Sequence, residues 1–280
     1  MPEWFLETLK DKRSSTEVED IIRNQNLNTV CQHARCPNRG ECFSKGTATF
    51  LLLGDTCTRN CGFCAINSGE PVKKDNREPY NILEAIKKMK LKYVVLTSVT
   101  RDDLELEGAD IFAKTVKLIK DYDENIKVEV LTPDFNNRDK LIDMVVSSNP
   151  DVYNHNLETV EKYYSKIRPQ AVYKRSLAVL EKIKKINNKI VTKSGIMVGL
   201  GEKKEEVKKV IDDLIGVKCD ILTIGQYIQP TDKNYPVKEY VTPETYKGYE
   251  IYGKKRGIDI IAGPLVRSSY MAHEYYKKTK

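Results

Sequence analysis

The chain has 280 residues, of which 40% are apolar and 31% charged, a composition typical of a soluble globular protein and not of a disordered one. The 47 basic and 40 acidic side chains give a net charge of +7, spread as lysine pairs between acidic residues and not packed into a nucleic-acid-binding stripe. The sequence begins without a recognisable signal peptide and has no uncharged apolar run near the roughly 18 residues that span a bilayer, which predicts a cytoplasmic protein.

Short apolar runs alternate with amphipathic helical stretches from residue 48 onward, after an acidic helical stretch at 15–23. The apolar runs are continuous and favour a parallel sheet covered on both faces. Strand–helix alternation predicts an α/β fold, either a barrel or a doubly wound sheet, with chemistry at the carboxyl ends of the strands. The predicted strands are 49–53, 93–97, 127–131, 152–156, 190–198, 220–227 and 258–262, and the predicted helices are 82–89, 109–120, 140–147, 174–186, 203–214 and 243–254.

Six of the seven cysteines lie in the first quarter of the chain, and Cys219 lies outside it. This clustering indicates metal binding and not a disulfide framework. Cys57, Cys61 and Cys64 are spaced C-x3-C-x2-C directly after the first of the alternating strands. Three thiolates on one tight loop hold three corners of a 4Fe–4S cluster and leave one iron open to a substrate. A zinc knuckle is the alternative, although zinc favours four protein ligands.

Polar and glycine-rich stretches follow later strands. Thr97 and Ser98 end the second strand, and Asn-His-Asn at 154–156 ends the fourth. The run 195–202 reads Gly-Ile-Met-Val-Gly-Leu-Gly-Glu, whose glycines would let the backbone approach a flat ring, with Glu202 expected to cap the next helix. A plain glycine-rich turn is the alternative.

A second cysteine triad lies nearer the amino terminus. Cys31, Cys36 and Cys42 are spaced C-x4-C-x5-C and offer three thiolates to a further cluster, which needs a fourth ligand from elsewhere. His33 is one candidate for that ligand, but only two residues from Cys31 it is expected to pack or hydrogen-bond locally. Near the other end, 267–270 reads Arg-Ser-Ser-Tyr.

Together these motifs resemble the lipoyl synthases of the radical S-adenosylmethionine (SAM) superfamily, over essentially the whole chain. One departure is Leu-Glu-Gly at 106–108, where that family has Asp-Gly-Gly. The resemblance implies an α/β fold, a partial (β/α)6-type TIM barrel of the radical SAM kind. It further implies an amino-terminal extension at 1–47, the barrel at 48–257, and a carboxy-terminal segment at 258–280 closing over the barrel mouth. The further family-like runs are 96–103, 155–159, 192–202 and 224–230.

The resemblance also implies the roles of the site residues. One 4Fe–4S cluster, which binds SAM, would be held by Cys57, Cys61 and Cys64. An auxiliary 4Fe–4S cluster would be held by Cys31, Cys36, Cys42 and Ser269. Arg267 and Ser269 would be the catalytic residues beside the auxiliary cluster, whereas Ser268 is expected to point away in an extended stretch and bond to backbone. The implied SAM contacts are Phe63, Thr97, Ser98, Asn154, Asn156, Glu158, Arg175, Met197, Gly199 and Tyr227.

In this family two sulfur atoms are inserted at C6 and C8 of an octanoyl chain that is amide-linked to a lysine of a carrier domain. The C–H bonds are unactivated, so a radical generated from SAM is required, and the auxiliary cluster supplies the sulfur. The implied partners are an octanoylated lipoyl carrier domain or the glycine-cleavage H protein, an electron donor such as ferredoxin or flavodoxin, and an iron–sulfur carrier that repairs the cluster. Neither nucleic acid nor a membrane is expected as a partner.

Other interpretations stay open for these residues. A methylthiotransferase acting on tRNA would share 57–64 but should bring clustered basic residues. A non-enzymatic iron–sulfur or zinc carrier would not need 195–202 or 267–270. Individually, 101–103 (Arg-Asp-Asp) would cap the next helix, Arg267 would pair with a surface carboxylate, and His155 and Cys219 would only pack.

Overall fold

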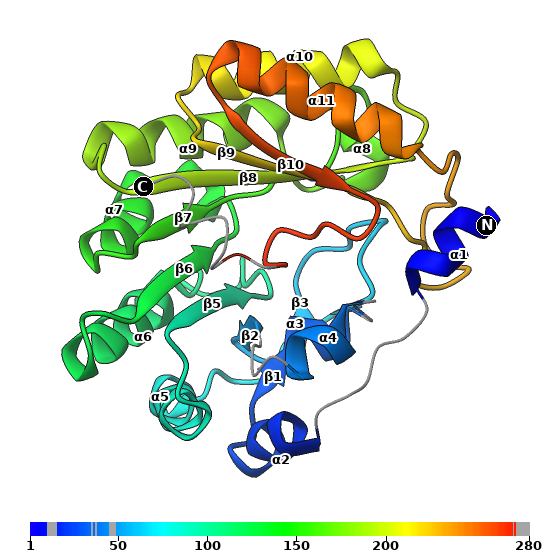
Figure 1. The fold of residues 1–280 in the computed structure, drawn as a ribbon. Coiled ribbons are helices and arrows are strands. Elements are labelled where there is room, and N and C mark those ends of the chain that lie inside the picture. Colours follow the sequence, from blue (N-terminus) through cyan, green and yellow to red (C-terminus); the bar gives the residue numbers. More distant parts are fainter. Residues whose placement is uncertain (10–15, 35, 37, 45–48, 271, 273–280) are drawn as a thin grey trace. The chain divides into compact units, whose positions relative to one another are not determined.

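The computed structural model describes the chain except residues 10–15, 35, 37, 45–48, 271 and 273–280 (Figure 1). The described residues form two compact units. The amino-terminal unit comprises Lys12–Arg59 and Ala65–Asn154, and the carboxy-terminal unit comprises Met1–Asp11, Asn60–Cys64 and His155–Lys280. The predicted boundaries at 47 and 257 stay a prediction.

The amino-terminal unit is built on a five-stranded part of the sheet in which β1 runs antiparallel to β2 and the other neighbours are parallel. The strands in sheet order are β1 (Asn28–Thr29), β2 (Thr49–Leu52), β5 (Tyr93–Ser98), β6 (Lys127–Leu131) and β7 (Val152–Asn154). The connecting helices α5, α6 and α7 pack in that order (Figure 1). They span Glu78–Met89, Ala109–Tyr122 and Asp139–Ser147.

Smaller elements precede and interrupt this alternation. α3 begins after Thr29, whose hydroxyl accepts the Gln32 N–H at 3.3 Å and caps the helix. α2 falls on the predicted helical stretch, whose first residue, Ser15, lies outside the described residues. These elements are α2 (Thr16–Asn24), α3 (Val30–His33), α4 (Arg39–Ser44), β3 (Thr56–Cys57), β4 (Asn67–Ser68) and the 3-10 turn η1 (Phe135–Asn137).

The carboxy-terminal unit contains three parallel strands, in the order β8, β9, β10, with α10 and α11 side by side over them (Figure 1). Gly257 directly follows α11, and its φ of 85° is the left-handed conformation that closes a helix. The strands span Val191–Val198, Ile221–Gln226 and Asp259–Gly263. The helices are α1 (Glu3–Leu9), α8 (Tyr164–Ile167), α9 (Tyr173–Ile186), α10 (Lys204–Gly216) and α11 (Pro243–Arg256), with the 3-10 turn η2 (Glu161–Tyr163) before α8.

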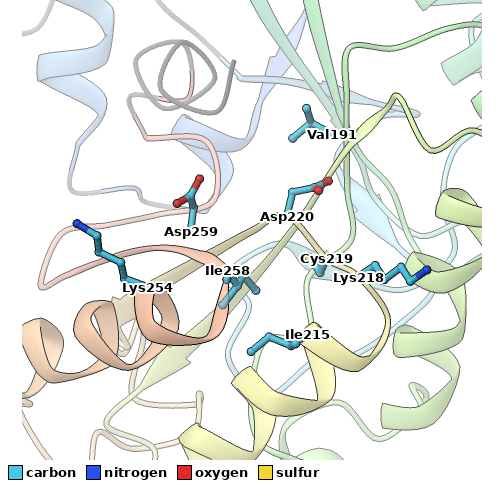
Figure 2. Close-up of a pocket in the computed structure, with 9 residues that line it drawn as sticks. Val191, Ile215, Lys218, Cys219, Asp220, Lys254, Ile258 and Asp259 are labelled. Atoms are coloured by element: carbon cyan, nitrogen blue, oxygen red, sulfur yellow. The ribbon is translucent and has the colours of Figure 1, made fainter.

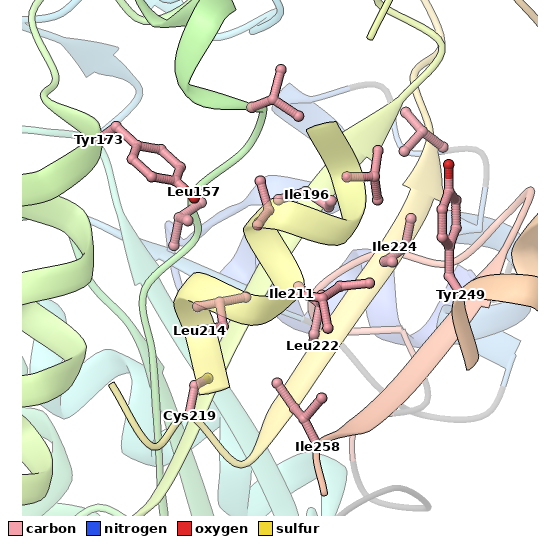
Figure 3. Packing of buried hydrophobic residues seen from close by; sticks show 14 of the residues in the cluster. Leu157, Tyr173, Ile196, Ile211, Leu214, Cys219, Leu222, Ile224, Tyr249 and Ile258 are labelled. Atoms are coloured by element: carbon pink, nitrogen blue, oxygen red, sulfur yellow. The ribbon is translucent and has the colours of Figure 1, made fainter. Parts of the chain in front are cut away.

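The core of the carboxy-terminal unit lies between these strands and α10 (Figure 3). Ile196, Leu222 and Ile224 of the strands face Ile211 and Leu214 of the helix, and all are at most 3% exposed. Burial of one such side chain contributes about 1.5–3 kcal/mol, so this face fixes α10 on the sheet.

The predicted fold class is confirmed as a mixed α/β chain with a mostly parallel sheet. Every predicted strand and helix between 48 and 263 is found, with ends that differ by a few residues. β7 ends two residues earlier than predicted, at Asn154. The backbone then turns, and Glu158, at φ 64°, forms an isolated bridge with Ile196 of β8. No described helix is long and apolar enough to cross a membrane.

Candidate functional site

The C-x3-C-x2-C loop begins in the amino-terminal unit, where backbone N–H groups surround the first thiol. The Cys57 sulfur accepts the N–H of Arg59 at 3.4 Å and that of Thr100 at 3.3 Å. Hydrogen bonds of this kind to a ligating sulfur tune an iron–sulfur cluster. Cys57 follows β2 in the chain, and its bond from Thr100 also places its sulfur at the carboxyl end of β5.

Arg59, inside the same loop, is buried between two carboxylates. Its Nε and Nη2 donate to the two oxygens of Asp102 at 2.8 Å each, and Nη2 also donates to Asp134 at 2.9 Å. Burial alone would lower the pKa of Arg59, but the two carboxylates outweigh burial and raise it. Arg59 thus ties the cysteine loop to the ends of β5 and β6, a role that the sequence interpretation missed.

The acidic partners of Arg59 belong to a wider network. Asn136 donates to Asp102 at 3.2 Å and to Glu107 at 2.8 Å. Arg138 forms an ion pair with Glu107 at 2.9 Å. Phe135 and Asn136 have φ of 44° and 47°, a costly conformation for non-glycine residues that the surrounding bonds must hold. Glu107, in the departure from the family pattern, is one of these anchors.

The rest of the cysteine loop belongs to the carboxy-terminal unit. Gly62 donates its N–H to the Ile167 carbonyl and accepts the Tyr235 N–H, both at 2.8 Å. The Asn234 side chain donates to the Cys64 carbonyl at 2.8 Å. The segment between Cys61 and Cys64 is therefore clamped by backbone on two sides.

Three of the predicted SAM contacts come together in the carboxy-terminal unit. Phe63 and Met197 pack against the buried cluster formed by Ile167, Leu200 and Tyr227. The Tyr227 hydroxyl donates to the Tyr235 carbonyl at 2.6 Å, and burial raises its pKa to about 12. This cluster offers an apolar surface suited to a flat ring. The neutral Tyr227 hydroxyl already has its hydrogen-bond partner in the Tyr235 carbonyl.

Three further predicted contacts share one row of the amino-terminal unit. Thr97 and Asn154 both pair in register with Leu131, and Ser98 follows Thr97. The Thr97 hydroxyl donates to the Leu131 carbonyl at 3.0 Å. Within the described chain, Ser98 Oγ and Asn154 Oδ1 are buried without a hydrogen-bond partner. Buried oxygens in this state fit a ligand that brings N–H donors, as the amino group of SAM does.

Two more predicted contacts, Asn156 and Glu158, lie after β7. Asn156 Nδ2 donates to Glu158 Oε1 at 3.0 Å, while Asn156 Oδ1 is buried with no partner among the described residues. Burial raises the pKa of Glu158. Arg175, in the first turn of α9, donates to the Gln170 carbonyl at 2.9 Å. The oxygens fit a SAM-type ligand, and the individual contacts stay predictions.

Gly199 and Glu202 have a structural explanation that the sequence interpretation did not give. A Cβ at Gly199 would overlap Gln226 Nε2 and the Glu239 carbonyl, and its φ is 96°. Glu202 does not cap α10, which was the expectation, because its carboxylate accepts the N–H groups of Gly199 and Leu200 at 2.7 and 2.9 Å. The role of Gly199 as a SAM contact stays a prediction.

Gly199→Ala should lower the free energy of unfolding by about 1–3 kcal/mol, because the new methyl group has no space and the backbone conformation is strained. The matched control is Gly216→Ala at the end of α10, where nothing lies within 4 Å of the added Cβ. That substitution should stabilise by up to about 1 kcal/mol. Urea denaturation measures both, and equal effects would contradict the packing argument.

The first triad gathers within the amino-terminal unit. Cys31 is buried on α3, Cys42 lies on α4, and Cys36 donates its N–H to the Cys31 carbonyl at 3.2 Å. Burial, with the nearby Cys36 and Cys42 thiols, raises the pKa of Cys31 to about 12. His33 bonds to Asn28 at 3.1 Å, which confirms the expected local contact. The Cys36 and Cys42 thiols thus both act on Cys31, but among the described residues no three such side chains are placed to hold a metal ion. The triad as a cluster ligand set stays a prediction.

The Arg-Ser-Ser-Tyr segment is a turn and not the extended stretch that was expected. Tyr270 donates its N–H to the Arg267 carbonyl at 3.1 Å, so Ser268 and Ser269 are the central residues. Ser268 Oγ accepts from the Asn156 side chain at 2.7 Å, which corrects the expectation of a bond to backbone. Arg267 Nη1 donates to the Val266 carbonyl at 2.7 Å.

Two of the remaining interpretations, those for 101–103 and Cys219, are decided by the structure. Arg101 pairs with Asp103 at 2.8 Å and Asp102 with Arg59, so 101–103 does not cap α6, which begins after Gly108. Cys219 is 4% exposed just before β9, as predicted.

A cavity of about 530 Å³ opens at the amino ends of β8, β9 and β10 (Figure 2). Val191, Asp220 and Asp259 stand at these strand starts and line it. Ligands of parallel α/β sheets bind at the carboxyl ends, so this cavity lies apart from the candidate site.

Comparison with known proteins identifies the family. The model of the Radical SAM superfamily matches residues 51–214. The lipoyl synthase of Caldicellulosiruptor saccharolyticus is 52% identical over 277 residues, which cover 99% of this chain and 97% of that protein. The lipoyl synthase of Caldanaerobacter subterraneus subsp. tengcongensis is 51% identical over 272 residues, covering 97% of this chain and 95% of the relative.

Solved structures are similar at the level of the fold. HydG, a maturase of the FeFe-hydrogenase, matches with a TM-score of 0.60 and 14% identity, over 99% of this chain and 69% of that one. SuiB of Streptococcus suis bound to S-adenosylmethionine matches with a TM-score of 0.63 and 14% identity, over 81% of this chain and 54% of that one. With the superfamily match and two lipoyl synthases above 50% identity over nearly the full length, the chain belongs to the lipoyl synthase family of radical SAM enzymes.

Proposed function

We propose that this radical SAM enzyme inserts two sulfur atoms, at C6 and C8, into an octanoyl chain carried on a lysine of a protein, giving the lipoyl cofactor. The observation that carries the proposal is the second thiol triad. The sequence brings Cys31, Cys36 and Cys42 within twelve residues, and the Cys36 and Cys42 thiols both act electrostatically on the buried Cys31 thiol. SAM cleavage alone needs one cluster, so a second ligand set supports a sulfur donor in the same chain.

The reacting C–H bonds explain why the family uses these cofactors. No side-chain acid or base has a pKa that ionises an alkane, so SAM and two 4Fe–4S clusters supply the radical chemistry and the sulfur when bound. The chain's own contribution is to hold and orient them. Cys57, Cys61 and Cys64 would hold the SAM cluster, and Ser98 and Asn154 of the amino-terminal unit offer buried oxygens to an amino group of SAM.

Ser269 is proposed as the fourth ligand of the auxiliary cluster, with Arg267 beside it. A serine alkoxide is a hard ligand on a soft, thiolate-bound cluster. Its bond can therefore be released while Cys31, Cys36 and Cys42 still hold the cluster. Release at this corner would open the cluster to the substrate without dismantling it.

Anaerobic reconstitution followed by iron and sulfide counting tests the proposal. About eight irons per chain, SAM-dependent 5′-deoxyadenosine and lipoyl product on an octanoylated carrier domain would support it. Zinc without iron would indicate a metal carrier. Two clusters with SAM cleavage and methylthio-tRNA product, but no lipoyl product, would indicate a methylthiotransferase.

The proposed partners are a lipoyl carrier domain or the glycine-cleavage H protein as substrate, ferredoxin or flavodoxin as reductant, and an iron–sulfur carrier for repair. Lipoyl carrier domains are commonly acidic, and this chain has a net charge of +7. Complementary charge steers two proteins together and is screened by salt over about 8 Å at physiological ionic strength.

The kcat/KM for an octanoylated carrier domain should therefore fall with added salt more steeply than that for a short octanoyl-lysine peptide. The peptide presents the same reacting chain without the acidic surface, which makes it the matched control. Initial rates from 50 to 500 mM salt, over which the Debye length shortens roughly threefold, measure both slopes. Equal slopes would contradict electrostatic docking.

A further inference from the structure

Ser268 and Ser269 share one β-turn at 267–270, so the backbone conformation of one depends on that of the other. Its closing hydrogen bond, from the Tyr270 N–H to the Arg267 carbonyl, leaves Ser268 and Ser269 as the two central residues. The dihedral angles of the central pair define a β-turn, so a rotation at one of them reorients the other. A contact that restrains Ser268 therefore also restrains the backbone at Ser269.

Ser268 is fixed by a residue far away in the chain. Its Oγ accepts a hydrogen bond of 2.7 Å from Asn156 Nδ2, across a separation of 112 residues. The same Nδ2 donates to Glu158 Oε1 at 3.0 Å, and Asn156 is only 7% exposed. The anchor is thus a buried amide that is itself held in place.

Gly195 makes room for this contact, and Gly225 makes room for the residues just before Ser268. A Cβ at Gly195 of β8 would stand 2.8 Å from Asn156 Oδ1 and 3.1 Å from Ser268 Oγ. A Cβ at Gly225 of β9 would overlap the Val266 carbonyl. The segment therefore lies directly on the sheet, and its position depends on the absence of two side chains.

We propose that Ser268 is a positioning residue, which through its hydrogen bond from Asn156 holds Ser269 in the direction needed to ligate the auxiliary cluster. The inference rests on the proposed function, in which Ser269 is that ligand. The Asn156 NH2 group holds the turn, while its Oδ1 is buried against Gly195 with no partner among the described residues. The orientation of Ser269 in this turn thus depends on a buried amide of the same unit.

The test variant is Ser268→Ala. It is compared with Ser268→Thr, which keeps the hydroxyl, with Ser269→Ala, which removes the proposed ligand, and with Ser165→Ala. Ser165 is exposed on α8 and serves as the matched control for loss of a serine hydroxyl. Each is made in the full chain and also in a Cys57→Ala, Cys61→Ala, Cys64→Ala background that carries only the auxiliary cluster. The readouts are the electron paramagnetic resonance (EPR) spectrum of the reduced auxiliary cluster, its rate of iron loss to EDTA, and the ratio of lipoyl product to 5′-deoxyadenosine.

Ser268→Ala should alter the EPR spectrum, speed iron loss about tenfold and lower the product ratio about tenfold, while SAM cleavage stays within about twofold of the unmodified chain. Ser268→Thr should restore the spectrum and the ratio. Ser269→Ala should show the same changes more severely, and Ser165→Ala none of them.

A Ser268→Ala chain with the unmodified spectrum and product ratio would overturn the inference and leave the proposed function standing. Equal loss of SAM cleavage and product, unrescued by threonine, would show a merely structural role and also overturn it. An unmodified chain that assembles no second cluster would instead overturn the proposed function, and the inference with it.

Discussion

Replacing Cys57, Cys61 or Cys64 with alanine should abolish 5′-deoxyadenosine formation and lipoyl product together. A loop that loses one of its three thiolates no longer holds the cluster on which SAM binds. Replacing Cys36 in the other triad should leave SAM cleavage measurable and abolish lipoyl product, because only the sulfur donor is lost. Iron should fall from about eight to about four per chain in both cases. Anaerobic iron analysis and chromatography of both products measure the difference.

Cys219→Ala is the matched control, since this thiol is outside both triads. Cys219 is 4% exposed, its Sγ contacts the Ile221 carbonyl at 3.4 Å, and burial raises its pKa to about 12. We expect full iron content and both activities, with only a modest loss of stability. A Cys36→Ala chain that still makes lipoyl product would refute the division of labour between the triads.

Arg59→Ala should lower the free energy of unfolding by about 3–5 kcal/mol and strongly reduce SAM cleavage. The substitution takes the guanidinium away from Asp134, whose side chain is 0% exposed, and a buried charge that loses its partner is costly. It also detaches the cysteine loop from β5 and β6. Urea denaturation and 5′-deoxyadenosine formation measure the two effects.

Arg77→Ala is the control, because that side chain is 84% exposed and lies 3.5 Å from Asp75. An exposed ion pair of this kind contributes about 0–1 kcal/mol. If Arg59→Ala does not fold, Arg59→Lys keeps the charge, loses the bidentate contact and should show an intermediate loss. Stability of Arg59→Ala equal to that of Arg77→Ala would contradict the anchoring role.

Much of the fold was predictable because its signals are local. Continuous apolar runs such as 93–97 and 220–227 placed β5 and β9, and amphipathic stretches placed α5, α6, α7, α9, α10 and α11. Element ends were less well predicted where tertiary contacts set them. β7 stops at Asn154 because the following backbone turns to pair with Ile196.

The candidate ligands were also readable from the sequence, since a spacing such as C-x3-C-x2-C brings thiolates onto one loop whatever the rest of the chain does. The contacts that hold these ligands and their neighbours in place could not be read from the sequence. Ser268 and Asp102 were assigned local partners, whereas they bond to the distant Asn156 and Arg59. Glu202 and Arg101 do bond locally, but to the N–H groups at 199 and 200 and to Asp103, and not as caps of the next helix.

The sequence by itself therefore determined the α/β alternation, both thiol triads and the family resemblance. Only the tertiary structure decided what holds those groups in place. Asn156 and Ser268 are 112 residues apart, and Arg59 and Asp134 are 75 apart. Which of these residues meet depends on the pairing register of parallel strands and on glycines that leave space at one point of a sheet. Hydrophobic periodicity specifies which face of a strand is buried, but it carries no information about which distant polar side chain will end beside it.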